Sequence, residues 1–237
     1  MEIGYNASPA MSSRVGGVAA LVVALLTVME VVFFIIYPPP ITVIGWFELF
    51  QSSPIIGLLD FWGLELFMYA MFILVFLALY MALKRVNQWS MAVALSLALL
   101  GVAIFYATNN PFSMLTLSNK YAIATTEMER VTLVAAGEAV LASTNQRAVG
   151  GFNIGLFLVS VAGLIVSVVM LRSTAFSRAT AYIGILAFGL SLADYIRQAT
   201  TSSVAIALLV ILPGALLLVV WFSLLGWRLL QLGRLRG

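Results

Sequence analysis

Six polar side chains lie in or next to apolar segments, and their chemistry is the first clue to function. These residues are Glu30, Glu65, Glu138, Asn153, Asp194 and Arg197. Ionisable groups are costly inside a bilayer, so each one is a candidate ligand-binding residue. The acids among them can attract a cationic ligand, hold a proton, or form a structural hydrogen bond.

Glu30 is the deepest of these acids. Counting along its apolar segment places it two turns, or roughly 10 Å, below the outer end. That segment contains no basic residue, so a charged partner must come from elsewhere, and Arg197 is the nearest by predicted depth. A structural hydrogen bond and a ligand or proton site both remain open for Glu30.

Structural roles are favoured for three of the other groups. Asp194 and Arg197 are three residues apart, so they can pair along one helix face. Glu65 is predicted at the outer boundary, where it reaches headgroup water. The stretch that contains Asp60 and Trp62 is expected to protrude among the outer headgroups.

Catalytic and metal chemistry have little support in the sequence. The chain has no cysteine and no histidine, and it lacks nucleophile-elbow, P-loop and zinc-protease motifs. We predict no catalytic residue, no cofactor and no metal. A carboxylate-only metal site of Glu30, Glu65 and Glu138 would require three separate segments to converge.

The composition identifies a membrane protein. Hydrophobic residues make up 63% of the 237 residues and charged residues only 9%, whereas a soluble domain carries about 25%. Lipid must therefore solvate much of the surface. The net charge of +3 is interpreted as a topology signal, and no nucleic-acid partner is expected.

Runs of about 20 apolar residues predict membrane-spanning helices. We predict an all-α protein, a single domain over residues 1–237 that forms a bundle of six transmembrane helices. The predicted spans cover residues 17–37, 55–84, 90–106, 151–171, 179–199 and 204–225. The second run has about 30 residues, which is longer than one crossing requires.

Two segments between spans are predicted to be helical without crossing the membrane. Residues 41–50 are short and mixed, which is typical of an interfacial piece. Residues 112–148 mix acids with apolar side chains, so we expect one or two amphipathic helices on the extracytoplasmic face.

Basic residues orient the bundle. With the N-terminus inside, eight of the twelve lysines and arginines fall in inner segments and four in outer ones. The inner group is Arg14, Lys84, Arg85, Arg172, Arg178, Arg228, Arg234 and Arg236. The positive-inside rule therefore predicts a cell-membrane protein with both termini in the cytoplasm.

Small residues in the fourth predicted span suggest close helix packing. Gly151 and Gly155 form one pair at four-residue spacing, and Gly163 and Ser167 form another. Such spacing lets helix backbones approach closely. Beyond the lipid bilayer, another membrane subunit or a second copy of the chain is a candidate partner for this face.

Two stretches resemble a known family. They are Gly137-Glu138-Ala139-Val140-Leu141-Ala142 and the region from Val168 to Gly184, which includes Leu171-Arg172-Ser173 and Phe176-Ser177-Arg178. They are similar to a membrane-protein family known only as a domain of unknown function, number four-three-eight-six. The resemblance implies six spans and a prokaryotic origin, and it implies no activity.

Three functions follow as hypotheses. The first is non-enzymatic binding or transport of a small ligand through an outward-facing polar vestibule. The second is a structural or accessory subunit of a membrane complex, in contact through the small-residue face. An enzyme is the least favoured. Outer acids that cluster would support the first hypothesis, whereas an exposed small-residue face would support the second.

Overall fold

The computed structural model describes residues 9–144, 153–200 and 203–235, which form helices and no β-strand. In chain order the elements are α1 (Pro9–Ile36), α2 (Val43–Ser52), α3 (Pro54–Leu58), the π-helical turn η1 (Leu59–Gly63), α4 (Leu64–Leu83), α5 (Gln88–Thr108), α6 (Pro111–Ile123), α7 (Glu127–Thr144), α8 (Ile154–Met170), α9 (Arg178–Thr200) and α10 (Val204–Leu235).

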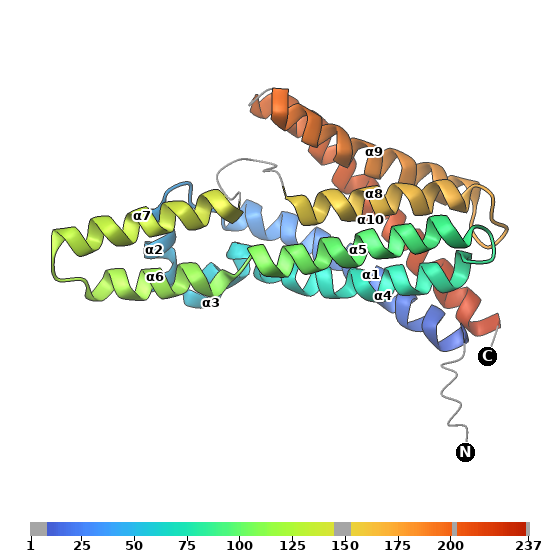
Figure 1. The fold of residues 1–237 in the computed structure, drawn as a ribbon, viewed down its shortest axis with the longest axis horizontal. Helices are drawn as coiled ribbons and strands as arrows, with labels where there is room; N and C mark the ends of the chain where they lie inside the picture. The colour runs from blue at the N-terminus through green and yellow to red at the C-terminus, as the bar shows by residue number, and fades with distance from the viewer. Residues whose placement is uncertain (1–8, 145–152, 201–202, 236–237) are drawn as a thin grey trace, which may run out of the picture.

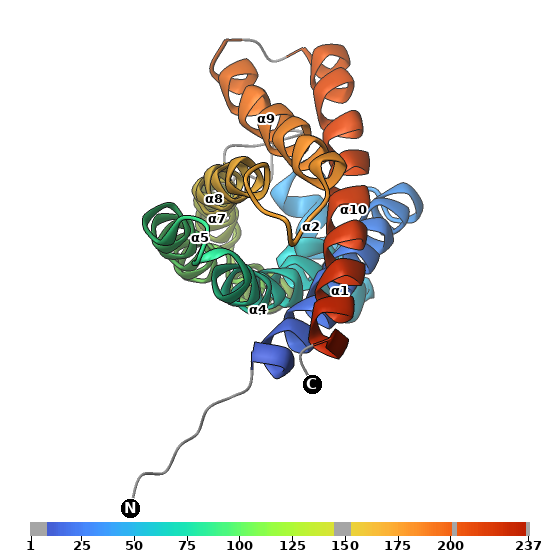
Figure 2. The ribbon, with the colours of Figure 1, turned by 90° about the vertical axis from the view of Figure 1, so that its right-hand side faces the viewer.

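Six long helices pack side by side in a ring, with an order that follows the chain. Each of α1, α4, α5, α8, α9 and α10 packs on the next in this order, and α10 closes the ring against α1 (Figure 2). Buried side chains such as Phe76, Val166 and Trp221 fill the core between them. We refer to these six helices as the bundle.

The bundle has the lengths and composition of a multi-pass membrane protein. Five helical stretches are long and apolar enough to cross a membrane: Ala10–Ile36, Pro54–Leu83, Gln88–Ile123, Arg178–Gln198 and Ala205–Leu235. The apolar helix Ile154–Met170 is shorter. The predicted all-α class is therefore confirmed, and each predicted span coincides at least in part with one of these helices.

The four helices α2, α3, α6 and α7 form a second unit, the cap, at one end of the bundle (Figure 1). Its core consists of Val43, Trp46, Phe47, Phe50, Met114 and Leu141, and Phe61 of η1 packs into the same cluster. The predicted amphipathic segment is present as two helices, α6 and α7, and its last residues, 145–148, lie outside the described part. The aromatic residues of α2 are covered by protein instead of facing an interface.

Short polar motifs delimit the helices. Pro38, Pro39 and Pro40 follow α1, and Asn87, Asn110 and Asn153 cap α5, α6 and α8. Each of these asparagines accepts a hydrogen bond from a first-turn amide, which supplies a partner to an N–H that the helix cannot satisfy.

The end of the bundle opposite the cap gathers most of the basic residues of the described chain, whereas Lys120 and Arg130 lie in the cap and Arg197 near the end of α9. The start of α1, the end of α10 and the α4–α5 and α8–α9 turns all lie there (Figure 1). The Arg14 Nε donates to the Gly233 carbonyl at 3.1 Å, and the Arg228 Nε donates to the Ala175 carbonyl at 2.6 Å. These bonds tie α1 and the α8–α9 turn to α10.

Candidate functional site

A break in helical geometry creates the centre of the site. Between α3 and α4 the backbone passes through η1, where Trp62 has φ 68° and ψ 6°. A bulky residue in this left-handed region is uncommon, and π-type turns inside helices are frequent at functional sites. Asp60 on this turn is 1% exposed and Phe61 is fully buried. Asp60 and Phe61 therefore pack inside the protein instead of protruding among headgroups, whereas Trp62 is half-buried.

Glu30 of α1 and Glu65 of α4 face each other. Their carboxyl groups are within hydrogen-bonding reach, and Glu65 is only 5% exposed. Glu65 therefore packs inside the protein, and the prediction that it reaches headgroup water is wrong. The predicted partner Arg197 is engaged elsewhere, so the neighbour of Glu30 is an acid and not a base.

Several buried polar atoms around this pair have no hydrogen-bond partner among the described residues. They are one carboxyl oxygen of Glu65, both of Asp60, the Tyr69 hydroxyl and the Trp62 indole N–H. Asp60 is close enough to Glu65, and Tyr69 close enough to both Glu30 and Glu65, to interact electrostatically. Buried polar groups are normally paired, so a cluster of unpaired ones marks a candidate functional site.

Aromatic rings surround this acidic site and limit its contact with water. Tyr69 stacks on Phe105 with ring centroids 3.7 Å apart, and Trp62 meets Phe105 edge-on at 5.8 Å. On the cap side, Phe61 packs edge-on against Trp46 at 4.9 Å. In such low-dielectric surroundings, charge interactions are stronger than in water.

Polar contacts between helices hold the acidic site in place. The Thr27 hydroxyl of α1 donates to the Met68 sulfur at 3.6 Å. The Tyr106 hydroxyl of α5 donates to the Leu66 carbonyl at 2.6 Å. These bonds fix α1 and α5 against the first turns of α4, next to Glu65.

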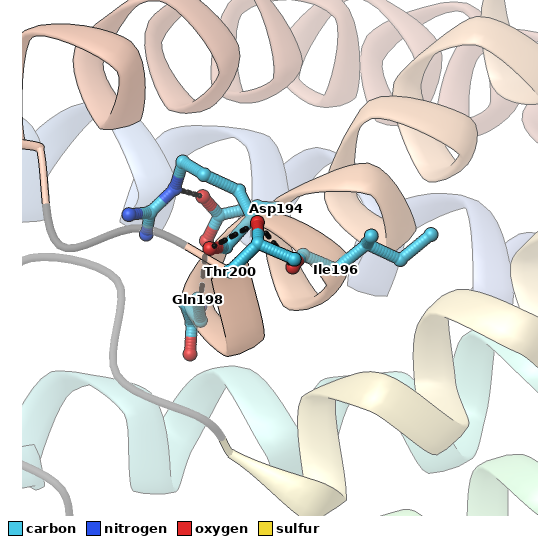
Figure 3. Close-up of polar contacts among 5 residues, drawn as sticks. Asp194, Ile196, Gln198 and Thr200 are labelled. Atoms are coloured by element: carbon cyan, nitrogen blue, oxygen red, sulfur yellow. Dashed lines mark hydrogen bonds and ion pairs between the residues drawn. The ribbon is translucent and has the colours of Figure 1, made fainter.

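Asp194 and Arg197 form the predicted ion pair near the end of α9. The Arg197 Nε lies 2.6 Å from one Asp194 oxygen, and the Gln198 amide donates to the other at 2.7 Å (Figure 3). In the same turns, the Thr200 hydroxyl donates to the Ile196 carbonyl at 3.1 Å. The carboxylate is therefore satisfied within its own helix.

The two remaining ligand candidates, Asn153 and Glu138, belong to other elements than the carboxyl pair. Asn153 caps α8, and its carbonyl accepts a hydrogen bond from the Tyr195 hydroxyl at 3.0 Å. Tyr195 in turn lies near Tyr69. Glu138 lies on α7 in the cap. Among the described residues, no three acids meet in a metal-binding group, so Glu30, Glu65 and Glu138 do not converge.

The small residues of α8 pack against neighbours within the chain. A Cβ atom on Gly155 would lie 2.7 Å from the Gly101 carbonyl of α5, and one on Gly163 would lie 2.3 Å from the Phe188 ring of α9. Ser167 is fully buried and donates to the Gly163 carbonyl at 2.8 Å. Gly151 lies outside the described residues.

Sequence reasoning missed Asp60 and Tyr69 as members of the site. One signal was available, because the second apolar run is longer than a single crossing and contains Asp60-Phe61-Trp62-Gly63. An overlong run with a polar interruption is compatible with a helix bulge. The position of Tyr69 beside Glu30 depends on how α1 packs against α4, which no local pattern encodes.

These features define a multi-pass helical membrane protein with a buried acidic site at the cap end of its bundle. Residues 57–227 match the family described as "Domain of unknown function (DUF4386)", and the chain belongs to this family. No curated protein and no solved structure matches the chain significantly. The matched region contains Asp60, Glu65 and Tyr69, whereas Glu30 precedes it.

Proposed function

We propose that this protein binds and transports a small cation, without enzymatic chemistry, at the Glu30–Glu65 pair. The observation that carries the proposal is that Glu30 of α1, which is half-buried, and Glu65 of α4, which is buried, face each other with no ion pair to any described basic residue. Buried like charges are unfavourable, so a bound cation would offset a cost that the fold leaves uncompensated.

On this proposal, a polar vestibule leads from the cap to the pair. Asp60 adds a third carboxyl group between the cap and the pair, and Tyr69 adds a hydroxyl beside it. Asn153, Asp194 and Arg197 lie at the ends of α8 and α9 that we assign to the same face. On this proposal they orient the access route, and Glu138 of the cap lies at its outer rim.

The proposal includes a topology in which α8 is a sixth span. It packs between α5 and α9 in the ring, so its neighbours on both sides are candidate spans. With six crossings, the basic end is cytoplasmic and the cap is extracytoplasmic, as the positive-inside rule predicts. The cation would therefore enter from outside a cell membrane.

The alternative function, an accessory subunit that docks through the small residues of α8, has less support. Gly155 and Gly163 already contact Gly101 and Phe188 of the same chain. A partner helix could not use these positions unless it displaced α5 or α9.

The experiment is a cation-dependent unfolding assay on the purified full-length protein in detergent. Sodium, potassium and methylammonium chloride would each replace N-methylglucamine chloride at constant ionic strength. A cation that binds only the folded state raises its stability, by about 2.7 kcal/mol at a hundred times the dissociation constant. We expect at least one of these cations to raise the unfolding temperature.

Matched variants identify the site. Glu30→Gln and Glu65→Gln should remove the cation effect and leave the protein folded, whereas Glu48→Gln, at an exposed acid on α2, should retain it. The cation that stabilises the wild type should also enter vesicles that contain it, and not vesicles that contain Glu65→Gln. If no tested cation stabilises the wild type, or if the effect persists in both Gln variants, the proposal is wrong.

A further inference from the structure

The contact between Glu30 and Glu65 restricts how the two carboxyl groups can be protonated. An ionised carboxylate can only accept hydrogen bonds, whereas a protonated carboxyl group also donates one. Glu30 and Glu65 come within hydrogen-bonding reach of each other, and no described basic residue pairs with either. A hydrogen bond between them therefore requires that one of the two carries a proton.

We propose that Glu30 and Glu65 share a single proton when no cation is bound, and that Asp60 is the group through which this proton exchanges with the cap side. This proposal rests on the proposed function for the identity of the cation. It adds that a proton takes the place of the cation between Glu30 and Glu65. Cation binding would then release the proton, so uptake of the cation is coupled to proton movement.

Asp60 is suited to this role by its position and its lack of partners. It is 1% exposed, neither of its carboxyl oxygens has a described partner, and it interacts electrostatically with Glu65. It also lies on η1, the irregular turn between the cap helix α3 and the bundle helix α4. The three acids therefore follow one another from the cap to α1: Asp60, Glu65, Glu30.

A second observation supports a site here. The Tyr69 hydroxyl is unpartnered, its side chain is 2% exposed, and it lies within electrostatic range of both acids of the pair. A phenol can donate to whichever carboxyl group is ionised, so it would stabilise the pair while one negative charge remains.

Few other titratable groups lie on the elements packed around the pair. Tyr195 of α9 interacts with Tyr69, and Tyr106 of α5 donates to the Leu66 carbonyl. The described part of α8 contains no ionisable side chain, and the ionisable residues of α10, Arg228 and Arg234, lie near its last turns at the opposite end. The charge on the pair therefore depends mainly on its own proton and on Asp60.

The exchange balances in atoms and charge. In the empty state one carboxyl group of the pair is neutral and the other is an anion, so the pair has charge −1. A monovalent cation then enters, the O–H bond of the neutral group breaks, and the proton passes through Asp60 toward the cap. Two carboxylates and one cation remain, again with charge −1, and no oxidant or reductant is needed.

Infrared spectroscopy of the full-length protein in lipid vesicles tests the shared proton, because protonated carboxyl groups absorb apart from carboxylates. At neutral pH and without the cation, we expect a protonated-carboxyl band from the pair equivalent to one group per chain. The band should shift in Glu30→Gln and in Glu65→Gln and be absent in the double variant. Glu48→Gln, at an exposed acid on α2, is the control and should leave it unchanged.

If the band shows that the pair contains no protonated carboxyl group, or two of them, the proposal of a shared proton is wrong. So would a band that neither single variant shifts. The amplitude of the protonated-carboxyl band in the wild type distinguishes one proton from two even if the double variant fails to fold. Any contribution of Asp60 to that amplitude is measured separately with Asp60→Asn.

The role of Asp60 is tested by the rate at which the pair exchanges its proton after a rapid change of pH. Proton transfer by a positioned side chain contributes large rate factors, so Asp60→Asn should slow the exchange at least about tenfold. Glu48→Gln should have no effect. An unchanged rate in Asp60→Asn would remove Asp60 from the route.

The two proposals can fail separately. If the pair has one protonated group but no cation stabilises the protein, then the pair is a proton site and the cation proposal is wrong. If a cation binds through the two acids but its binding releases no proton, then the cation site stands and the shared proton is wrong.

Discussion

Glu30, Asp60 and Glu65 differ from the other acids of the described chain in what surrounds them. Asp194 accepts hydrogen bonds from Arg197 and Gln198 on its own helix, which explains its burial without any ligand. The three acids at the cap end have no such local compensation. A structural acid can therefore be told apart from a functional candidate by where its hydrogen bonds go, and depth alone does not separate them.

The conformation of Trp62 gives a prediction at the residue scale. A side chain in the left-handed region costs roughly 1–2 kcal/mol, and glycine avoids this cost. Trp62→Gly and Trp62→Ala both remove the ring that packs on Phe105, but only the glycine relieves the backbone. We expect the Trp62→Gly protein to be more stable than the Trp62→Ala protein in reversible unfolding in detergent.

An ordinary helical position supplies the control. Leu77 is partly exposed on α4, and there alanine should be more stable than glycine by about 1 kcal/mol, the usual helical order. The same order at Trp62, with alanine the more stable, would show that Trp62 does not adopt the left-handed conformation.

At the scale of elements, the cap is stabilised by its own core and by a capping motif at the start of α7. The Thr126 hydroxyl accepts a hydrogen bond from the Glu129 amide at 3.2 Å. The Glu129 carboxylate accepts bonds from the Thr126 and Thr125 amides at 3.2 and 3.0 Å. This reciprocal arrangement is a capping box, and the Thr-x-x-Glu spacing in the sequence is its signature.

The capping box makes the start of α7 sensitive to acid. The hydrogen bonds from the Thr126 and Thr125 amides hold the pKa of Glu129 below its usual value of 4.5. Because the folded pKa is lowered, the stabilisation is present above the usual value and is lost as the pH falls through the folded value. At neutral pH, we expect the Thr125 and Thr126 amides to exchange hydrogen more slowly in the wild type than in Glu129→Gln.

The difference between the wild type and Glu129→Gln should shrink as the pH falls below the usual pKa of 4.5 and the carboxylate is protonated. Comparison at each pH removes the intrinsic pH dependence of exchange, which both proteins share. A difference that persists at the lowest pH would mean that the carboxylate charge does not support the helix.

At the scale of the whole molecule, the ring of six helices separates two ends with different chemistry. The acids without basic partners, Glu30, Asp60 and Glu65, lie at the cap end, and most of the described basic residues lie at the opposite end, where Arg14 and Arg228 donate to backbone carbonyls. If the basic end is cytoplasmic, the acidic site opens outward, which is the direction that the proposed function requires.

The orientation can be tested with single cysteines, because the natural chain contains none. Asn119 is exposed on α6 in the cap, and Thr174 is exposed in the α8–α9 turn. A membrane-impermeant maleimide should label Asn119→Cys in intact cells and should label Thr174→Cys only after permeabilisation. The reverse pattern would place the cap in the cytoplasm and contradict the outward-facing site.

The sequence by itself determined the class of protein, the approximate positions of the membrane helices and the local pairing of Asp194 with Arg197. These features follow from properties that neighbouring residues share: runs of apolar side chains, breaks at proline and asparagine, and a spacing of three along a helix. Glu30 could also be selected as a site candidate, since any acid so deep in an apolar segment is costly.

Only the tertiary structure decided which groups meet. Glu30 and Glu65 lie on different helices, and their contact depends on how α1 rotates and slides against α4. Asp60 is buried because the chain turns through η1, and a continuous helix over the same residues would orient it differently. Close packing of distant segments sets these relations, and single-sequence patterns report only on residues that are near in the chain.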